Sequence, residues 1–369
     1  MADGTIRVDP GTLERFMKDA FVKMGVPEAD AATCAKVLIA SDLRGVESHG
    51  IGRLKYYYDR IKRGQHEPVT RIEVVKDTPV TAVWDGHHGM GHVIAHQAMA
   101  AAIEKARAHG LGAVAVRNST HFGIAGYYVL MAVEAGMIGV CCTNARPSVA
   151  PTHSTEPLLG TNPLTFGFPT DEEFPFVFDA ATSIVQRGKI EMLAREGKPT
   201  PPGYVVGEAG EARTDTPKIL EDFLAGKAAL LPLGGAGEEY AGYKGYDFAA
   251  VVELLSCVLC GGTFLRGLSG FNPDGSPARY RLGHLFVAIN PEFFVGLETC
   301  KELAGRVCRT LRSAKLAPGA TRVYTAGEKE YLAEKMVREK GVPINPGLQA
   351  DLRVVVEELG IEGYDFLDG

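Results

Sequence analysis

The chain has 369 residues, of which 46% are hydrophobic and 23% are charged, and its formal net charge at pH 7 is −6. No basic cluster stands out, which argues against nucleic acid or an anionic membrane surface as the partner. The N-terminus lacks the apolar stretch of a secretion signal, and no run of about 18 apolar residues occurs, so we expect a cytoplasmic protein without membrane contact. Seven scattered cysteines indicate reduced thiols.

The first 62 residues predict three helices, over residues 10–24, from Pro27 to about Arg44, and over about residues 52–62. A polar stretch at the junction of the second and third helices contains Ser48, His49 and Arg53. A histidine that exchanges a proton near neutral pH stands four residues before a permanently charged guanidinium. This pair suits an anionic substrate whose hydroxyl must lose a proton, although a helix junction with solvated charges explains the same residues.

The middle of the chain alternates strands and helices, which is typical of an α/β fold. We expect strands at residues 71–75, 80–84, 113–116, 137–143, 164–168, 176–178 and 284–289, with helices at 92–109, 124–135, 187–196 and 242–260. Residues 198–217 are expected to form a surface loop, and the chain is mainly helical from residue 291 onward. The predicted organisation is an α/β body of residues 71–290 and a mainly helical region made from residues 1–70 and 291–369.

Polar residues follow two of the predicted strands. Asn118–Gly123, which includes His121, follows one strand, and Asp179–Ser183 follows another. Ligands of α/β proteins bind at the carboxyl ends of strands, so these segments favour a cleft. Helix capping by Asp179 and Ser183 is the simpler explanation of the second segment taken alone.

Neither the dinucleotide fingerprint G-x-G-x-x-G nor a P-loop occurs, so an ordinary Rossmann domain is disfavoured. His87, His88, His92 and His96 crowd together but lack the glutamate of a zincin motif, and we do not expect a metal site. Cys257 and Cys260 have redox-motif spacing inside an apolar helix, where core packing is the favoured interpretation.

Six motifs occur in this order along the chain: Asp42–Leu54, Asn118–Gly123, Gly160–Pro163, Asp179–Ser183 with Arg187–Lys189, Leu231–Gly235 and Gly242–Tyr246. Together they make the chain resemble the type-2 malate/L-lactate dehydrogenase family, whose NAD(P)-dependent enzymes are unrelated in fold to Rossmann dehydrogenases. The resemblance covers roughly residues 10 to 345 and implies a non-Rossmann mixed sheet. The chain departs from the family pattern at Glu238 and Glu239, in a longer and more acidic turn, and at Asp247.

The resemblance also implies roles for individual residues. His49 would transfer the proton, with Ser48 and Asp179 as relay or orienting partners and His121 in the same pocket. Arg53 would hold the substrate carboxylate, beside Thr161 and Asn162. The cofactor would be NAD or NADP, with NAD slightly preferred and no metal. Its contacts would come from Asp179, Ala180, Ala181, Thr182, Ser183, Lys244, Gly245, Gly327 and Glu328.

The expected reaction interconverts a small 2-hydroxy acid and its 2-oxo acid, with malate as the first substrate and L-lactate, sulfolactate or ureidoglycolate as others. Reduction of a diketo sugar acid or a cyclic imine carboxylate is the alternative within the enzyme class. Two hypotheses from other classes are a non-catalytic nucleotide-binding protein and a metal-dependent hydrolase. We also expect a homodimer in which the helices of residues 10–62 form the contact, because Tyr56, Tyr57 and Tyr58 cannot all face one core.

Overall fold

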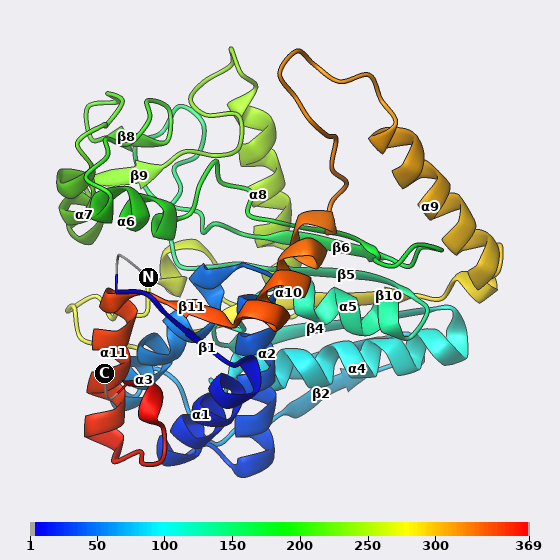
Figure 1. The fold of residues 1–369 in the computed structure, drawn as a ribbon, viewed down its shortest axis with the longest axis horizontal. Coiled ribbons are helices and arrows are strands. Elements are labelled where there is room, and N and C mark those ends of the chain that lie inside the picture. The colour runs from blue at the N-terminus through cyan, green and yellow to red at the C-terminus, as the bar shows by residue number, and fades with distance from the viewer. Residues whose placement is uncertain (1–3, 368–369) are drawn as a thin grey trace.

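The computed structural model describes residues 4–367, and its centre is a seven-stranded sheet (Figure 1). Among its described strands, β3 and β4 are the one parallel pair, and the other neighbours are antiparallel. This mixed sheet confirms the expected non-Rossmann α/β fold. In spatial order the strands are β2 (Glu73–Asp77), β3 (Thr81–Asp85), β4 (Leu111–Ser119), β10 (Leu282–Ile289), β5 (Ile138–Thr143), β6 (Leu164–Phe168) and β7 (Phe176–Ala180).

Helices cover both faces of the sheet (Figure 1). On one face lie α4 (Gly91–His109) and α5 (Gly126–Glu134), and on the other lies α8 (Gly242–Cys257), which contacts β10, β5 and β4. The alanines of α4 allow close packing, and a Cβ on Gly112 of β4 would lie 2.0 Å from the carbonyl oxygen of Ala102. The sequence predicted α4 almost to the residue because its apolar spacing is long and regular.

The two ends of the chain share one hydrophobic core. The strand β1 (Ile6–Val8) pairs antiparallel with β11 (Val342–Ile344), and both strands pack against helices from each end. The sequence missed these strands because each has three residues and its partner lies more than 300 positions away, as in Ile6 and Ile344. Most helical residues of this core come from α1 (Pro10–Lys23), α2 (Glu28–Leu43), α3 (Leu54–Lys62) and α11 (Pro346–Leu359).

A further core lies between residues 149 and 249. It contains α6 (Arg187–Arg195), α7 (Thr216–Ala225) and the paired strands β8 (Val205–Gly207) and β9 (Ala228–Leu230). The expectation of a plain loop over residues 198–217 was wrong, since β8 and the start of α7 lie there. The division of the chain into two parts stays a prediction.

Two further helices precede α11 in the chain. The helix α9 (Leu297–Arg312) contacts the turn between β6 and β7, and an irregular segment leads back from it to α10 (Glu328–Lys340) (Figure 1). Among residues 4–367, no helix is long and apolar enough to cross a membrane. Short 3-10 turns complete the structure at Glu47–His49, Ile51–Arg53, Leu265–Leu268, Pro291–Phe293 and Asp365–Leu367.

Candidate active site

The polar stretch between α2 and α3 is held by a buried carboxyl group. The Oδ2 atom of Asp42 accepts a hydrogen bond from the N–H of Ile51 at 2.8 Å, and a Cβ on Gly50 would lie 1.8 Å from Oδ1. Glycine is therefore required at position 50, because the chain passes directly over the Asp42 side chain. Two consecutive 3-10 turns, Glu47–His49 and Ile51–Arg53, result from this bend.

These turns bring three predicted site residues together. The Oγ of Ser48 lies 2.8 Å from Nδ1 of His49, and the Nε of Arg53 donates a hydrogen bond to the carbonyl oxygen of Ser48 at 2.6 Å. The bond fixes the Arg53 side chain on the backbone of Ser48, the residue that precedes His49.

The second histidine comes from the loop after β4. The ring of His121 stacks on that of His49, with centroids 5.6 Å apart and an interplanar angle of 20°. The Tyr57 hydroxyl oxygen lies 2.6 Å from Nδ1 of His121, and the N–H of Gly123 donates to the same nitrogen at 3.3 Å. Because a backbone N–H can only donate, Nδ1 accepts and the ring proton resides on Nε2.

Both imidazoles are neutral at neutral pH. Burial lowers the pKa of His49 to about 3, and the charge of Arg53 contributes in the same direction. Burial also lowers the pKa of His121 well below its usual value, followed by the effects of His49 and Arg53. A carboxylate bound to Arg53 would offset that positive charge and raise the pKa of His49 towards the working range.

A cavity of about 380 Å³ extends from His49 across the carboxyl end of β7. Apolar side chains of Val46, Ile124 and Val177 form part of its wall, and the backbone of residues 123–126 forms another part. Two helices, α5 and α10, begin at its edge. Four predicted site residues besides His49 and Asp179 line it: Thr161, Ala180, Ala181 and Gly327.

Asp179 faces this cavity. Its Oδ2 accepts a hydrogen bond from the N–H of Gly126 at 2.7 Å, and its Oδ1 accepts one from Oγ1 of Thr165 at 3.0 Å. Burial raises the pKa of Asp179, while these two hydrogen bonds and the charge of Arg44 act in the opposite direction. Within residues 4–367, the hydrogen-bond partner of His49 is Ser48 and not Asp179. The role of Asp179 as an orienting partner stays a prediction.

Other predicted residues lie outside the cavity lining. The side chain of Asn162 is buried and bonds to the carbonyl oxygen of Ala249, to Glu253 and to the N–H of Ala145, so its amide holds the chain together. The hydroxyl of Thr182 donates to the carbonyl oxygen of Asn162 at 3.0 Å, and that of Ser183 donates to a backbone carbonyl at 2.8 Å.

Three more predicted cofactor residues are also absent from the cavity lining. Lys244 is exposed at the start of α8, and Gly245 packs directly on the backbone of Leu233. The Glu328 side chain is 1% exposed and pairs with two arginines. Their predicted contacts with a cofactor are untested.

The cavity also contains residues to which the sequence assigned no role. Arg44 is half-buried in the lining, where burial lowers its pKa and Glu330, Glu334 and Asp179 raise it. Lys329 is a second cation on the wall. Proximity in sequence to predicted site residues was the signal that could have identified both cations. Arg44 lies in the same motif as His49, and Lys329 directly follows Glu328.

The histidines of residues 87–96 contact different residues. His87 pairs with Glu73, the Nδ1 of His88 lies 2.7 Å from the carbonyl oxygen of Tyr280, and His96 contacts the Tyr127 hydroxyl at 3.3 Å. His92 is fully buried. Across the described residues, no group of three or more His, Cys, Asp or Glu side chains is placed to hold a metal ion.

The cavity fits a nicotinamide nucleotide. The first turns of α5 and α10 offer partial positive charge, which favours a diphosphate, and Arg44 and Lys329 add full charges. The apolar wall suits a flat ring, and Gly327 adopts a φ of +89° where a Cβ would press on the start of β7. The cavity lining includes His49, on which His121 stacks, and Arg53 follows in the same loop. This set of side chains defines an oxidoreductase that acts on a small acid.

Comparison with known proteins gives the family. The model of the malate/L-lactate dehydrogenase family matches residues 8–353, and the chain belongs to this family. It is 41% identical over 358 residues to the malate dehydrogenase of Pyrococcus horikoshii, covering 97% of each chain. It is 38% identical to the L-sulfolactate dehydrogenase of Methanocaldococcus jannaschii over 97% of this chain and 99% of the relative. The crystal structure of malate dehydrogenase from Entamoeba histolytica superposes with a TM-score of 0.93 at 42% identity, covering 97% of this chain and 99% of that chain.

Proposed function

We propose that the protein interconverts malate and oxaloacetate with a nicotinamide cofactor. The observation that carries this proposal is the stacked pair of His49, which lines the cavity, and His121, with Arg53 bonded to the backbone of the neighbouring Ser48. In this proposal Arg53 holds the C1 carboxylate with two parallel hydrogen bonds. The nicotinamide, when bound, supplies the acceptor or donor of the hydride at C2.

The protein side chains then manage the proton. Neutral His49 accepts the proton of the substrate hydroxyl, and its contact with Ser48 orients the ring. His121, with its proton on Nε2, donates a hydrogen bond to the substrate oxygen, where negative charge develops when the oxo acid is reduced. The bound carboxylate offsets Arg53, so His49 becomes a stronger base only when substrate is present.

A second carboxylate of the substrate is supported by the cations around Tyr56. The guanidinium carbons of Arg60 and Arg53 lie 5.0 and 5.9 Å from the centroid of the Tyr56 ring. Burial raises the pKa of Tyr56 to about 12, and Arg146 is among the charges that act to lower it. Lys55 pairs with Asp59 at 3.0 Å instead. A cluster of this kind suits an acid with two negative groups, such as malate or sulfolactate, better than L-lactate, ureidoglycolate or a cyclic imine carboxylate.

The cofactor preference within this proposal is NAD. Glu330 and Asp179 line the cavity, and carboxylates repel the additional phosphate of NADP. Arg44 and Lys329 also line the cavity and attract that phosphate, so the preference for NAD over NADP is expected to be small.

A screen of 2-oxo acids with NADH and NADPH tests the reaction, followed by the loss of reduced-nicotinamide absorbance. We expect oxaloacetate with NADH to give the largest kcat/KM. Reduction of a diketo sugar acid or cyclic imine carboxylate alone would support the alternative substrates. Nucleotide binding without turnover of any acid would support the non-catalytic hypothesis.

We further propose a cytoplasmic homodimer with a different contact from the one that the sequence suggested. Tyr57 is fully buried and Tyr58 is 9% exposed within the chain itself, so these tyrosines do not support a contact at residues 10–62, and that placement stays a prediction. Large apolar side chains are exposed on α8 and α9 instead. They are Phe248, Val251 and Leu254 on α8, its C-cap residue Val258, and Leu303, Val307 and Leu311 on α9.

Exposed apolar faces of this extent are typical of subunit contacts. Light scattering at micromolar concentration tests the dimer, and charged substitutions at Leu254 and Val307 test its placement. A monomeric mass with full activity would reject the dimer.

A further inference from the structure

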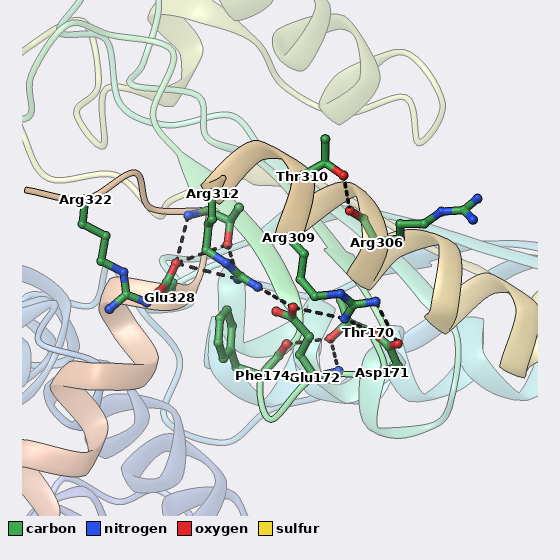
Figure 2. Close-up of polar contacts among 11 residues, drawn as sticks. Thr170, Asp171, Glu172, Phe174, Arg306, Arg309, Thr310, Arg312, Arg322 and Glu328 are labelled. Atoms are coloured by element: carbon green, nitrogen blue, oxygen red, sulfur yellow. Dashed lines mark hydrogen bonds and ion pairs between the residues drawn. The ribbon is translucent and has the colours of Figure 1, made fainter. Parts of the chain in front are cut away.

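A chain of ion pairs connects three distant segments next to the cavity (Figure 2). It joins the turn between β6 and β7 to α9 and to the first residue of α10. The irregular segment from residue 313 to residue 327, which ends at the cavity, lies between the two helices. The participating side chains are Asp171, Glu172, Arg309, Arg312, Arg322 and Glu328, which we call the arginine network.

The helix α9 supplies two of the three arginines. Arg309 binds Asp171 with two hydrogen bonds of 2.8 and 3.1 Å, and it also contacts Glu172 at 3.3 Å. Arg312 pairs with Glu172 and donates a hydrogen bond to Oγ1 of Thr325 at 3.1 Å. Arg312 therefore links the turn after β6 to the end of the irregular segment.

Glu328 closes the network from the other side. Its side chain is 1% exposed and pairs with Arg322, while its Oε2 lies 3.8 Å from Arg312 and accepts a hydrogen bond from the N–H of Thr325 at 3.1 Å. A buried carboxylate is stable only when charged partners and hydrogen bonds compensate for the lost water. The position of Thr325 therefore depends on these arginines.

The same segment forms a wall of the cavity. Thr325, Ala326 and Gly327 line it, and the carbonyl oxygen of Ala326 accepts a hydrogen bond from the N–H of Val177 at 3.1 Å. Glycine is favoured at position 327, because its φ is +89° and a Cβ there would lie 3.0 Å from the Val177 nitrogen. The wall is thus held between the arginine network and β7, the strand that carries Asp179.

We propose that Arg312 is a positioning residue for nucleotide binding, which acts through Thr325 and Glu328 and does not touch the ligand. This inference rests on the proposed function, since it takes this cavity as the nucleotide site. A segment without regular secondary structure has many conformations, and ordering it during binding weakens affinity. The network orders the segment beforehand, so its removal weakens the nucleotide complex more than it slows the chemical step.

The test compares Arg312→Met with Arg306→Met in the full-length chain. Arg306 lies on the same helix and carries the same charge, but its guanidinium points away from the network (Figure 2), and none of the described side chains pairs with it. We expect Arg312→Met to raise the Kd of NADH at least tenfold in a fluorescence titration. Its kcat at saturating NADH should stay within threefold of the unmodified protein. Arg306→Met should change neither.

Two further variants protect the test against simple loss of folding. Glu172→Gln keeps the shape of the turn and removes the nearer of the two carboxylates that pair with Arg312, so a smaller rise in Kd is expected. Arg312→Lys should restore part of the affinity, because an ammonium can pair with Glu172 but cannot bridge to Thr325 as well. If Arg312→Met does not fold, the Kd of NADH for Glu172→Gln tests the inference instead, and an increase supports it.

The outcomes separate this inference from the proposed function. An unchanged Kd of NADH in Arg312→Met or Glu172→Gln, with a lowered Tm, would show that the network only stabilises the fold. That result would overturn the inference and leave the proposed function intact. Failure of the unmodified chain to bind NADH or NADPH would overturn both.

Discussion

The Tyr57 hydroxyl oxygen lies 2.6 Å from Nδ1 of His121, and the Tyr57 side chain is fully buried. Together with the N–H of Gly123, this hydroxyl keeps the imidazole proton on Nε2. Tyr57→Phe removes one of the two donors, and we expect kcat to fall about 5- to 10-fold, because one hydrogen bond contributes about 1 kcal/mol. Steady-state kinetics check this, with Tyr58→Phe as the control, since the Tyr58 hydroxyl bonds to Glu358 instead.

His49→Ala is expected to lower kcat by about two to four powers of ten, the usual size of general acid–base catalysis, while the nucleotide still binds. His121→Ala should lower kcat less, since His121 only donates a hydrogen bond in the proposed mechanism. Parallel measurement of kcat and of the Kd for NADH distinguishes the two roles. If His49→Ala is nearly active and His121→Ala is inactive, then His121 transfers the proton and His49 donates the hydrogen bond.

Arg53→Lys is expected to raise the KM for the oxo acid about 10- to 100-fold although the charge is preserved, because an ammonium cannot form the two parallel hydrogen bonds of a guanidinium. The change also removes the hydrogen bond from Nε to the carbonyl oxygen of Ser48. The KM for NADH should stay nearly constant. Equal increases for both substrates would place Arg53 outside the substrate site.

Arg146→Met tests the second carboxylate. We expect kcat/KM for oxaloacetate to fall about tenfold or more, since a hydrogen bond to a charged group contributes about 1.5–3 kcal/mol. The value for pyruvate, which lacks the second carboxylate, should change less than threefold. Lys55→Met is the matched control, because its ammonium pairs with Asp59. Equal losses for both oxo acids would remove Arg146 from substrate recognition.

Asp42 makes the stability of the fold depend on pH. Burial raises its pKa from 3.8 to about 8, although the hydrogen bond from Ile51 acts in the opposite direction. The folded protein thus keeps a proton that the unfolded chain releases, and this group lowers the free energy of unfolding as the pH rises from 3.8 to 8. Asp42→Asn cannot titrate and retains an oxygen for Ile51.

Urea unfolding at pH 5 and at pH 8 checks this effect. The stability of Asp42→Asn relative to the unmodified protein should increase between the two values. Glu208→Gln, an exposed change elsewhere in the chain, should give no such trend. A relative stability that falls with pH would contradict the raised pKa.

The long elements of this fold could be predicted from the sequence, and the short ones could not. Regular apolar spacing over many residues predicted α4, which buries a continuous face on the sheet. The pairs β1 with β11 and β8 with β9 have three residues in each strand, and their backbone hydrogen bonds come from partners far away in the chain. Local pattern carries no information about such a partner.

The same distinction applies to the site. The sequence alone determined that Ser48, His49 and Arg53 lie together, because residues of one tight loop must be close in space. Only the tertiary structure decided that His121 stacks on His49, that Tyr57 bonds to it, and that Arg44 lines the cavity. The tertiary structure also decided that the Glu328 side chain is buried and pairs with two arginines. The orientation of a carboxylate depends on the charged side chains that distant segments place around it.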